Sequence, residues 1–84
     1  MKWTNLATRN QTVKERQILG DNIVRCMLRR GVSHSALAEQ TKIDLGRIYS
    51  LTKGRAKRVT DAELTKIAEA LGEPEKYLRP RVTS

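Results

Sequence analysis

The sequence is poor in the residues that build disulfides, metal sites and large aromatic cores. It has one cysteine, Cys26, one histidine, His34, and no phenylalanine. A single cysteine can form no internal disulfide, and without clustered cysteine or histidine ligands we expect no zinc site. Cys26 is expected to be a small buried hydrophobic residue on a helix. The sequence therefore predicts no metal and no cofactor.

Long apolar segments are also missing. No run of about 18 apolar residues is present that could span a membrane, and the first ten residues, MKWTNLATRN, lack the continuous apolar stretch of a signal peptide. At 84 residues the chain has room for one small domain. It offers no set of nucleophile, base and orienting group. These absences predict a cytoplasmic protein that is not an enzyme.

Positive charge is what the chain has in excess. Seventeen Lys and Arg against nine Asp and Glu give a net charge of +8. The excess is uneven, because residues 1–30 carry +5, residues 31–58 carry +4 and residues 59–84 carry −1. Such a split is expected of a protein that turns one face toward a polyanion. The first two thirds are therefore predicted to carry a nucleic-acid surface.

Apolar residues that recur three and four positions apart predict an all-α protein. Two capping boxes, Thr12-x-x-Glu15 and Thr60-x-x-Glu63, open helices, and a glycine closes each of them. Two short helices joined by a tight turn in a basic chain predict a helix-turn-helix at 33–51. In all, five helices are expected, over residues 13–30, 33–40, 45–51, 60–72 and 74–78.

A resemblance to a known family lies in residues 34–51, which spell HSALAEQTKIDLGRIYSL. Gly54 and the segment LTKIAEALG at 64–72 extend it, so that it covers about residues 18–79. In these features the chain is similar to the phage repressor and Cro family, also called XRE or lambda-repressor-like. The resemblance implies a compact five-helix lambda-repressor-like DNA-binding domain. Its expected parts are an N-terminal arm or extension at 1–12, the helix-turn-helix domain at 13–79 and a C-terminal tail at 80–84.

The resemblance also implies which residues meet double-stranded DNA. The helix at 45–51 would lie in the major groove, and the helix at 33–40 would cross the backbone with its N-terminus on a phosphate. The residues at or beside base-reading positions are Asp44, Leu45, Gly46, Arg47 and Ser50. Those at phosphate-contact positions are His34, Ser35, Lys53, Arg55, Lys57 and Arg58.

The reading helix departs from the family pattern. Leu45 offers only apolar contact, for which a thymine methyl is the natural partner, and Gly46 offers no side chain. Direct readout would then depend on Arg47 and Ser50. Arg47 has two alternative roles, a bidentate contact to a guanine or a contact to a phosphate. Because direct contacts are few, DNA shape is expected to contribute to specificity.

Two positions outside the reading helix also depart from the family pattern. Lys42 stands where the turn usually has glycine, which would cost about 1 kcal/mol if that residue is left-handed. The family's common Arg/Glu pair between the first helix and the reading helix falls on Met27 and Thr52. We therefore expect an uncharged contact there, with no buried charge left unpaired.

Residues 1–12 have two open interpretations. Val24 and Leu28 form an apolar i, i+4 pair that the inward stripe of the first helix does not use. The N-terminal segment could fold over this pair, in its own chain or in a partner's. Alternatively, it is a mobile arm in which Lys2 and Arg9 follow the DNA.

Charge, helical pattern and resemblance together predict a sequence-specific DNA-binding transcriptional regulator of a phage or prokaryote. It would be Cro- or repressor-like, occupying an operator as a homodimer, at least on DNA, and excluding polymerase. Tyr77 and Leu78 with the tail, or residues 1–12, are the expected sources of dimer contacts. The alternative is an antitoxin of a toxin–antitoxin pair that represses its own operon. An exposed apolar patch unrelated to the DNA face would favour that alternative.

Overall fold

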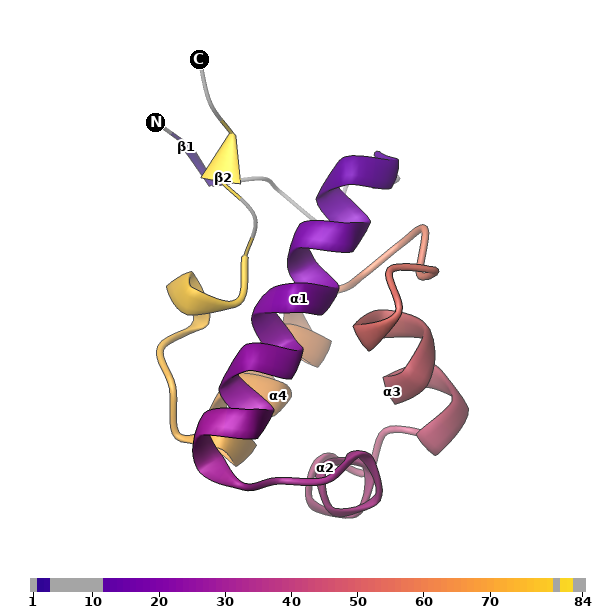
Figure 1. Ribbon diagram of the computed structural model, residues 1–84, viewed down its shortest axis with the longest axis vertical. Coiled ribbons are helices and arrows are strands. Elements are labelled where there is room, and N and C mark those ends of the chain that lie inside the picture. The colour runs from indigo at the N-terminus through magenta and orange to yellow at the C-terminus, as the bar shows by residue number, and fades with distance from the viewer. Residues whose placement is uncertain (1, 4–11, 80, 83–84) are drawn as a thin grey trace.

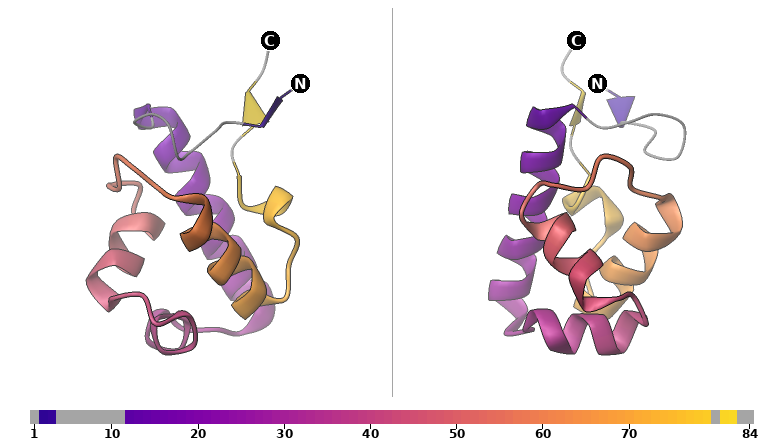
Figure 2. Two further views of the ribbon diagram at one scale, coloured as in Figure 1. Left: turned by 180° about the vertical axis from the view of Figure 1, so that it is seen from behind. Right: turned by 90° about the vertical axis from the view of Figure 1, so that its right-hand side faces the viewer.

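The computed structural model describes residues 2–3, 12–79 and 81–82, and it is built almost entirely of helices (Figure 1). The longest helix, α1, crosses the molecule, with α4 packed behind it and α3 at its side (Figures 1 and 2). α2 closes one end. The elements are β1 (Lys2–Trp3), α1 (Val13–Arg30), α2 (His34–Thr41), α3 (Leu45–Thr52), α4 (Asp61–Leu71), the 3-10 turn η1 (Glu75–Tyr77) and β2 (Arg81–Val82).

Hydrogen-bonded caps set the starts of α1 and α4. The Thr12 hydroxyl accepts from the Glu15 amide at 3.1 Å, and the Glu15 carboxylate accepts from the Thr12 amide at 2.9 Å. Thr60 and Glu63 repeat this exchange at the start of α4, with both distances at 3.1 Å. Each box satisfies two amides that the first turn of a helix leaves without a partner. Both predicted capping boxes are confirmed.

The prediction of five helices is wrong in its last member, because the described part of the chain has four α-helices and one 3-10 turn. Pro74 keeps an extended backbone, with ψ at 143°, so the turn starts only at Glu75. Leu78 is fully buried in the core, and its carbonyl accepts a hydrogen bond from the Asn22 side chain at 3.0 Å. Only three residues, 75–77, lie between Pro74 and Leu78, and they are too few to form an α-helix.

Lys42 ends α2 in the left-handed conformation, with φ at 63° and ψ at 20°. It is the only non-glycine residue of the described part of the chain with positive φ. An L-residue in this region is strained by about 1–2 kcal/mol. The condition under which the sequence implied a cost at this position is therefore met.

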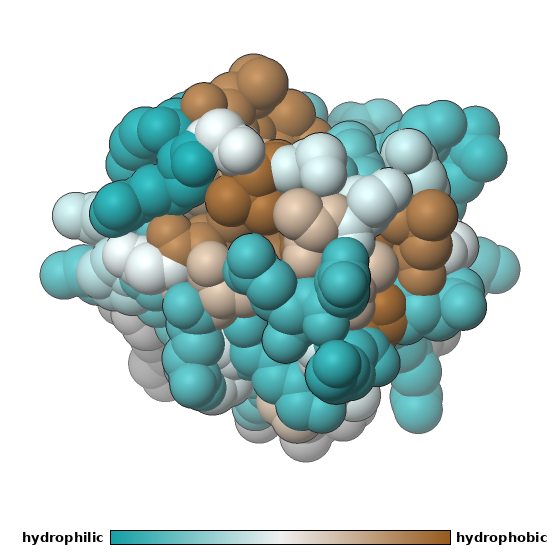
Figure 3. Space-filling model, turned by 90° about the horizontal axis from the view of Figure 1, so that it is seen from below, coloured by the Kyte–Doolittle hydropathy of each residue, from teal (hydrophilic) through white to brown (hydrophobic). Residues whose placement is uncertain are grey.

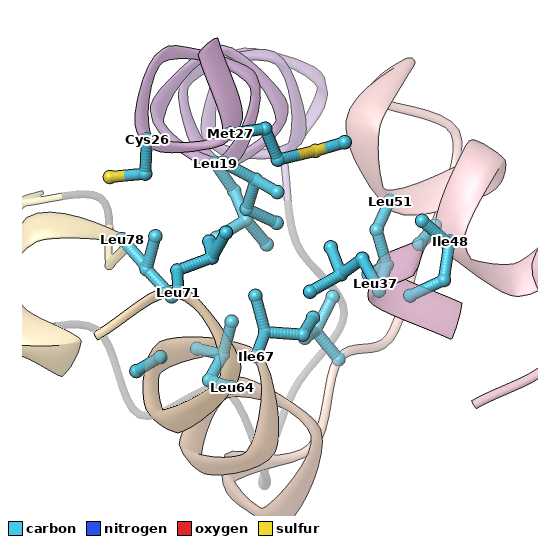
Figure 4. Packing of buried hydrophobic residues seen from close by; sticks show 14 residues of the cluster. Leu19, Cys26, Met27, Leu37, Ile48, Leu51, Leu64, Ile67, Leu71 and Leu78 are labelled. Atoms are coloured by element: carbon cyan, nitrogen blue, oxygen red, sulfur yellow. The ribbon is translucent and has the colours of Figure 1, made fainter. Parts of the chain in front are cut away.

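The hydrophobic core lies between the four helices, and its side chains converge from all of them (Figure 4). Cys26 is part of this core at 2% exposure, as expected of a small hydrophobic residue. Its burial raises the pKa of the thiol, so the thiol stays protonated at neutral pH. The core residues that are almost wholly buried include Leu19, Ile23, Leu37, Ile48, Leu51, Leu64, Ile67, Leu71 and Leu78.

A glycine sets how closely α1 approaches α3. A Cβ at Gly20 would lie 2.6 Å from the Thr52 carbonyl oxygen and 2.9 Å from that of Leu51. Both are backbone atoms at the end of α3, so neither can move aside without shifting the helix. Met27 and Thr52, which stand in place of the family's ion pair, are both buried, and neither brings a charge into the interior.

The two short strands bring segments from opposite ends of the sequence together. β1 and β2 pair antiparallel, with Lys2 opposite Val82 and Trp3 opposite Arg81. Residues 4–11, on which both interpretations of the N-terminal segment depend, lie outside the described residues. The proposed boundaries at 12 and 80 therefore stay predictions.

Candidate nucleic-acid interface

The predicted helix-turn-helix is formed by α2, α3 and the turn between them, at one end of the molecule (Figure 2). α2 follows Ser33, whose hydroxyl accepts a hydrogen bond from the Ala36 amide at 3.1 Å. α3 follows Asp44, whose carboxylate accepts from the Gly46 amide at 3.0 Å. Asp44, one of the predicted DNA-facing residues, therefore also caps the reading helix.

The outward side of α3 carries most of the predicted base-reading residues. Ile48 and Leu51 point into the core and are buried. Leu45 is 39% exposed, Gly46 is exposed and Ser50 is half-buried. The structure thus places Leu45 and Gly46 on the solvent side of the helix, with Ser50 at its edge.

Arg47 is turned toward α4. Its Nε donates to one Glu63 carboxylate oxygen at 2.8 Å, and its Nη2 donates to the other at 2.9 Å. Nη2 also donates to the backbone carbonyl of Arg58. Three of the five N–H groups of a guanidinium are thus engaged within the protein. A bidentate contact of Arg47 to a guanine would require some of these bonds to break.

Glu63 is the acidic partner that the sequence patterns did not indicate as part of this site. The hydrogen bonds from Arg47 hold the pKa of the Glu63 carboxyl below its usual range, against the opposing effect of burial. The same hydrogen bonds raise the pKa of the Arg47 guanidinium. Both groups are therefore charged at neutral pH. A capping box alone predicts only the bond from Glu63 to Thr60, because the partner on α3 depends on tertiary packing.

Tyr49 is a second residue that the sequence interpretation missed. It is 40% exposed on α3, four residues after Leu45 and four before Lys53. That spacing places the three side chains on one helix face, and it could have identified Tyr49 from the sequence. The Lys53 ammonium lies 5.5 Å from the centre of the Tyr49 ring, at the distance of a cation–π contact.

His34, the first residue of α2, is held against α3. Its ring stacks on the Tyr49 ring, with centroids 4.3 Å apart and planes at 7°. Its Nε2 lies 3.1 Å from the Thr52 hydroxyl oxygen, and that hydroxyl donates its own proton to the Tyr49 carbonyl at 3.2 Å. These contacts fix the imidazole beside the N-terminus of α2, where Ser35 is exposed.

The loop after α3 presents its charges to solvent and its apolar residues to the core. Arg55, Lys57 and Arg58 are exposed, whereas Ala56 and Val59 are buried, at 5% and 0% exposure. With Lys53, the loop carries four cations and no acidic residue over residues 53–58. We call residues 53–58 the basic loop. It lies in sequence and space directly after the reading helix.

Neither a metal site nor a membrane-spanning helix is found among the described residues. In that part of the chain, no group of three or more His, Cys, Asp or Glu side chains is arranged to hold a metal ion. None of its helices is long and apolar enough to cross a membrane.

Comparison with known proteins gives two kinds of match. The family model of the Cro/C1-type HTH DNA-binding domain matches residues 22–74. No curated protein resembles the chain closely enough in sequence to count as a relative. Among solved structures, the restriction-modification controller protein C.AhdI from Aeromonas hydrophila is 20% identical, with a TM-score of 0.72 over 77% of this chain and 97% of that one. At this identity the likeness concerns the fold alone.

Two further structures are more similar in sequence. The clp gene regulator ClgR from Corynebacterium glutamicum is 26% identical, with a TM-score of 0.71 over 81% of this chain and 69% of that one. Streptomyces albus HEPD is 28% identical with a TM-score of 0.68, over 79% of this chain but only 15% of that one, so the likeness is to a small part of HEPD.

The family model spans α2, the turn, α3, the basic loop and α4, which are the elements that form the described site. The chain belongs to the Cro/C1-type helix-turn-helix DNA-binding family.

Proposed function

We propose that this chain regulates transcription by binding a specific operator as a homodimer and excluding polymerase from the promoter. The observation that carries the proposal is the outward face of α3, which is exposed at Leu45 and Gly46 and bordered by the cations of the basic loop. A helix that enters the major groove needs such a face, with phosphate contacts on both of its sides.

Affinity would come mainly from phosphate contacts. The basic loop supplies Lys53, Arg55, Lys57 and Arg58 on one side of α3. His34 and Ser35 would supply contacts at the N-terminus of α2, where the helix dipole favours an anion. Each phosphate that a cation neutralises steepens the salt dependence of binding by a slope of about 0.9.

Specificity would come from Leu45, Gly46 and Ser50, with Asp44 and Arg47 beside them. The exposed Leu45 side chain fits a thymine methyl, and the absence of a side chain at Gly46 lets the helix backbone approach the base edges. One domain then reads only a few base pairs directly. A two-fold symmetric operator read by two copies, with half-sites about one helical turn apart, would double that information.

Salt titration of mutants tests the phosphate contacts. Binding of a fluorescent operator duplex is followed by anisotropy between 50 and 200 mM salt. Lys57→Ala is expected to weaken binding to every sequence and to reduce the salt slope by about 0.9. Lys66→Ala, on the exposed side of α4, is the matched control, because it removes the same charge elsewhere. Equal slopes for both variants would contradict a phosphate contact at Lys57.

An antitoxin role is a second candidate, and a specific surface favours it. Leu28 is 79% exposed on α1 beside the half-buried Val24. Seen from the α2 end, the surface has an apolar area on the side of α1 (Figure 3). Such a patch outside the reading face is typical of a protein contact. Co-expression with the product of the neighbouring gene, followed by co-purification that Leu28→Asp abolishes, would support this candidate.

A further inference from the structure

We infer that the Arg47–Glu63 ion pair is a strut that sets the position of the basic loop relative to the reading helix, and that it makes both residues positioning residues for phosphate binding. The inference rests on the proposed function. It assigns Arg47 a role within the protein in place of a contact to a base.

The first observation is how fully Arg47 is engaged. Its guanidinium donates hydrogen bonds to both carboxylate oxygens of Glu63, at 2.8 and 2.9 Å, and its side chain is 34% exposed. A two-pronged arginine–carboxylate contact fixes direction as well as distance. It joins the first turn of α3 to the first turn of α4.

The second observation is that Glu63 is itself held. The oxygen that accepts from Arg47 Nη2 also accepts from the Thr60 amide at 3.1 Å and lies 3.3 Å from the Thr60 hydroxyl. The next residue, Leu64, is fully buried in the core. The carboxylate therefore cannot follow Arg47 toward DNA without opening the capping box of α4.

The third observation is that the strut reaches the loop backbone. Arg47 Nη2 donates to the carbonyl of Arg58, at the end of the basic loop. The side chains of Ala56 and Val59 anchor the loop in the core, so this bond fixes the stretch that carries Lys57 and Arg58 between two anchors. Cations held in place in the free protein lose less conformational freedom when they bind phosphates.

Base reading by Arg47 is the competing account, and it predicts the opposite effect of changing Glu63. If Arg47 had to leave Glu63 to reach a guanine, Glu63→Gln would release it and add one positive charge, so that DNA would bind more tightly. If the pair is a strut, Glu63→Gln loosens the loop, and DNA binds more weakly despite the added charge. Glutamine can keep the capping box, so α4 stays formed in this variant.

The experiment compares wild type, Glu63→Gln and Arg47→Lys in anisotropy titrations with a selected operator duplex and a scrambled duplex of equal length. Arg47→Lys keeps the charge but loses the two-pronged geometry. Both variants are expected to bind the two duplexes about tenfold more weakly, with the salt slope reduced by about 1 to 2, which corresponds to one or two lost phosphate contacts. Tighter or unchanged binding by Glu63→Gln, or a loss by Arg47→Lys confined to the operator, would overturn the inference.

Arg79→Lys is the control for a merely structural effect. Arg79 makes a similar two-partner ion pair, to Asp61 at 2.8 Å and Glu75 at 2.7 Å, at the start of α4 but away from α3. It is expected to leave the affinity and the salt slope unchanged. Amide hydrogen exchange at residues 56–59 should accelerate in the two strut variants and not in Arg79→Lys. A wild-type protein that binds neither duplex would contradict the proposed function instead.

Discussion

At the scale of single residues, Lys42 places a strained backbone conformation in the turn between α2 and α3. Lys42 has φ at 63°, a conformation that glycine adopts without the clash of a Cβ. The sequence marks this position as unusual, because the resemblance to the family implies a glycine there. The lysine side chain is exposed. It takes part in none of the ion pairs found among the described residues.

Replacing that lysine should therefore stabilise the protein. Lys42→Gly is expected to raise the free energy of unfolding by about 0.5–1 kcal/mol, since relief of the strain exceeds the entropy that glycine adds to the unfolded chain. Urea denaturation followed by circular dichroism measures it. Lys66→Gly, in the interior of α4, is the matched control and should lose about 1 kcal/mol. A loss of similar size in both variants would show that Lys42 is not strained.

Pairs of elements determine the geometry of the DNA-binding face. α3 is fixed against α1 by the close approach at Gly20, against α2 by the His34–Tyr49 stack, and against α4 by the Arg47–Glu63 pair. Each contact joins residues far apart in the sequence. In each contact the partner depends on how the helices pack, which helical periodicity does not predict.

Two glycine variants separate the scaffold from the reading face. Gly20→Ala places a Cβ 2.6 Å from a backbone oxygen of α3, and it is expected to lower the free energy of unfolding by roughly 1–3 kcal/mol. At Gly46 a Cβ would meet only the Asp44 carboxylate, at 3.0 Å, which is a side-chain atom and not backbone, so Gly46→Ala should cost less stability than Gly20→Ala. Instead it should weaken operator binding, because the helix backbone can no longer approach the bases as closely. Urea denaturation and anisotropy titration measure the two effects.

The Arg47–Glu63 pair also predicts how stability depends on pH. The pKa of Glu63 is lower in the folded protein than its ordinary value of about 4.3. Its contribution to stability is therefore fully present above pH 4.3 and is lost as the pH falls through the folded pKa. The stability difference between wild type and Glu63→Gln should shrink between pH 5 and 3. A difference that stays constant over this range would contradict a stabilising charge at Glu63.

Features that depend on neighbouring residues could be predicted from the sequence, whereas features that depend on tertiary packing could not. The two capping boxes and the buried stripe of α4 depend on neighbours within a few residues, and they were predictable. The fifth helix was not, since Pro74 and the burial of Leu78 leave room for one 3-10 turn only. The partner of Arg47 could not be predicted, because Glu63 is 16 residues away on another helix.

The whole molecule separates its charges by function. The basic loop carries four cations without an acidic neighbour in residues 53–58. In the acidic closing third, by contrast, Glu73 lies 3.0 Å from Arg29 and 3.5 Å from Arg30, and Arg79 pairs with two carboxylates. Acidic residues of the closing third thus form ion pairs within the domain.

We propose that α3 and the basic loop together form a surface that recognises a specific DNA sequence. In vitro selection of duplexes from a random pool tests it most directly, with sequencing of the bound fraction after each round. We expect enrichment of one two-fold symmetric site whose halves lie about 10 base pairs apart, with a thymine at a fixed place in each half. Binding that retains every sequence of the pool equally, at all salt concentrations, would contradict it.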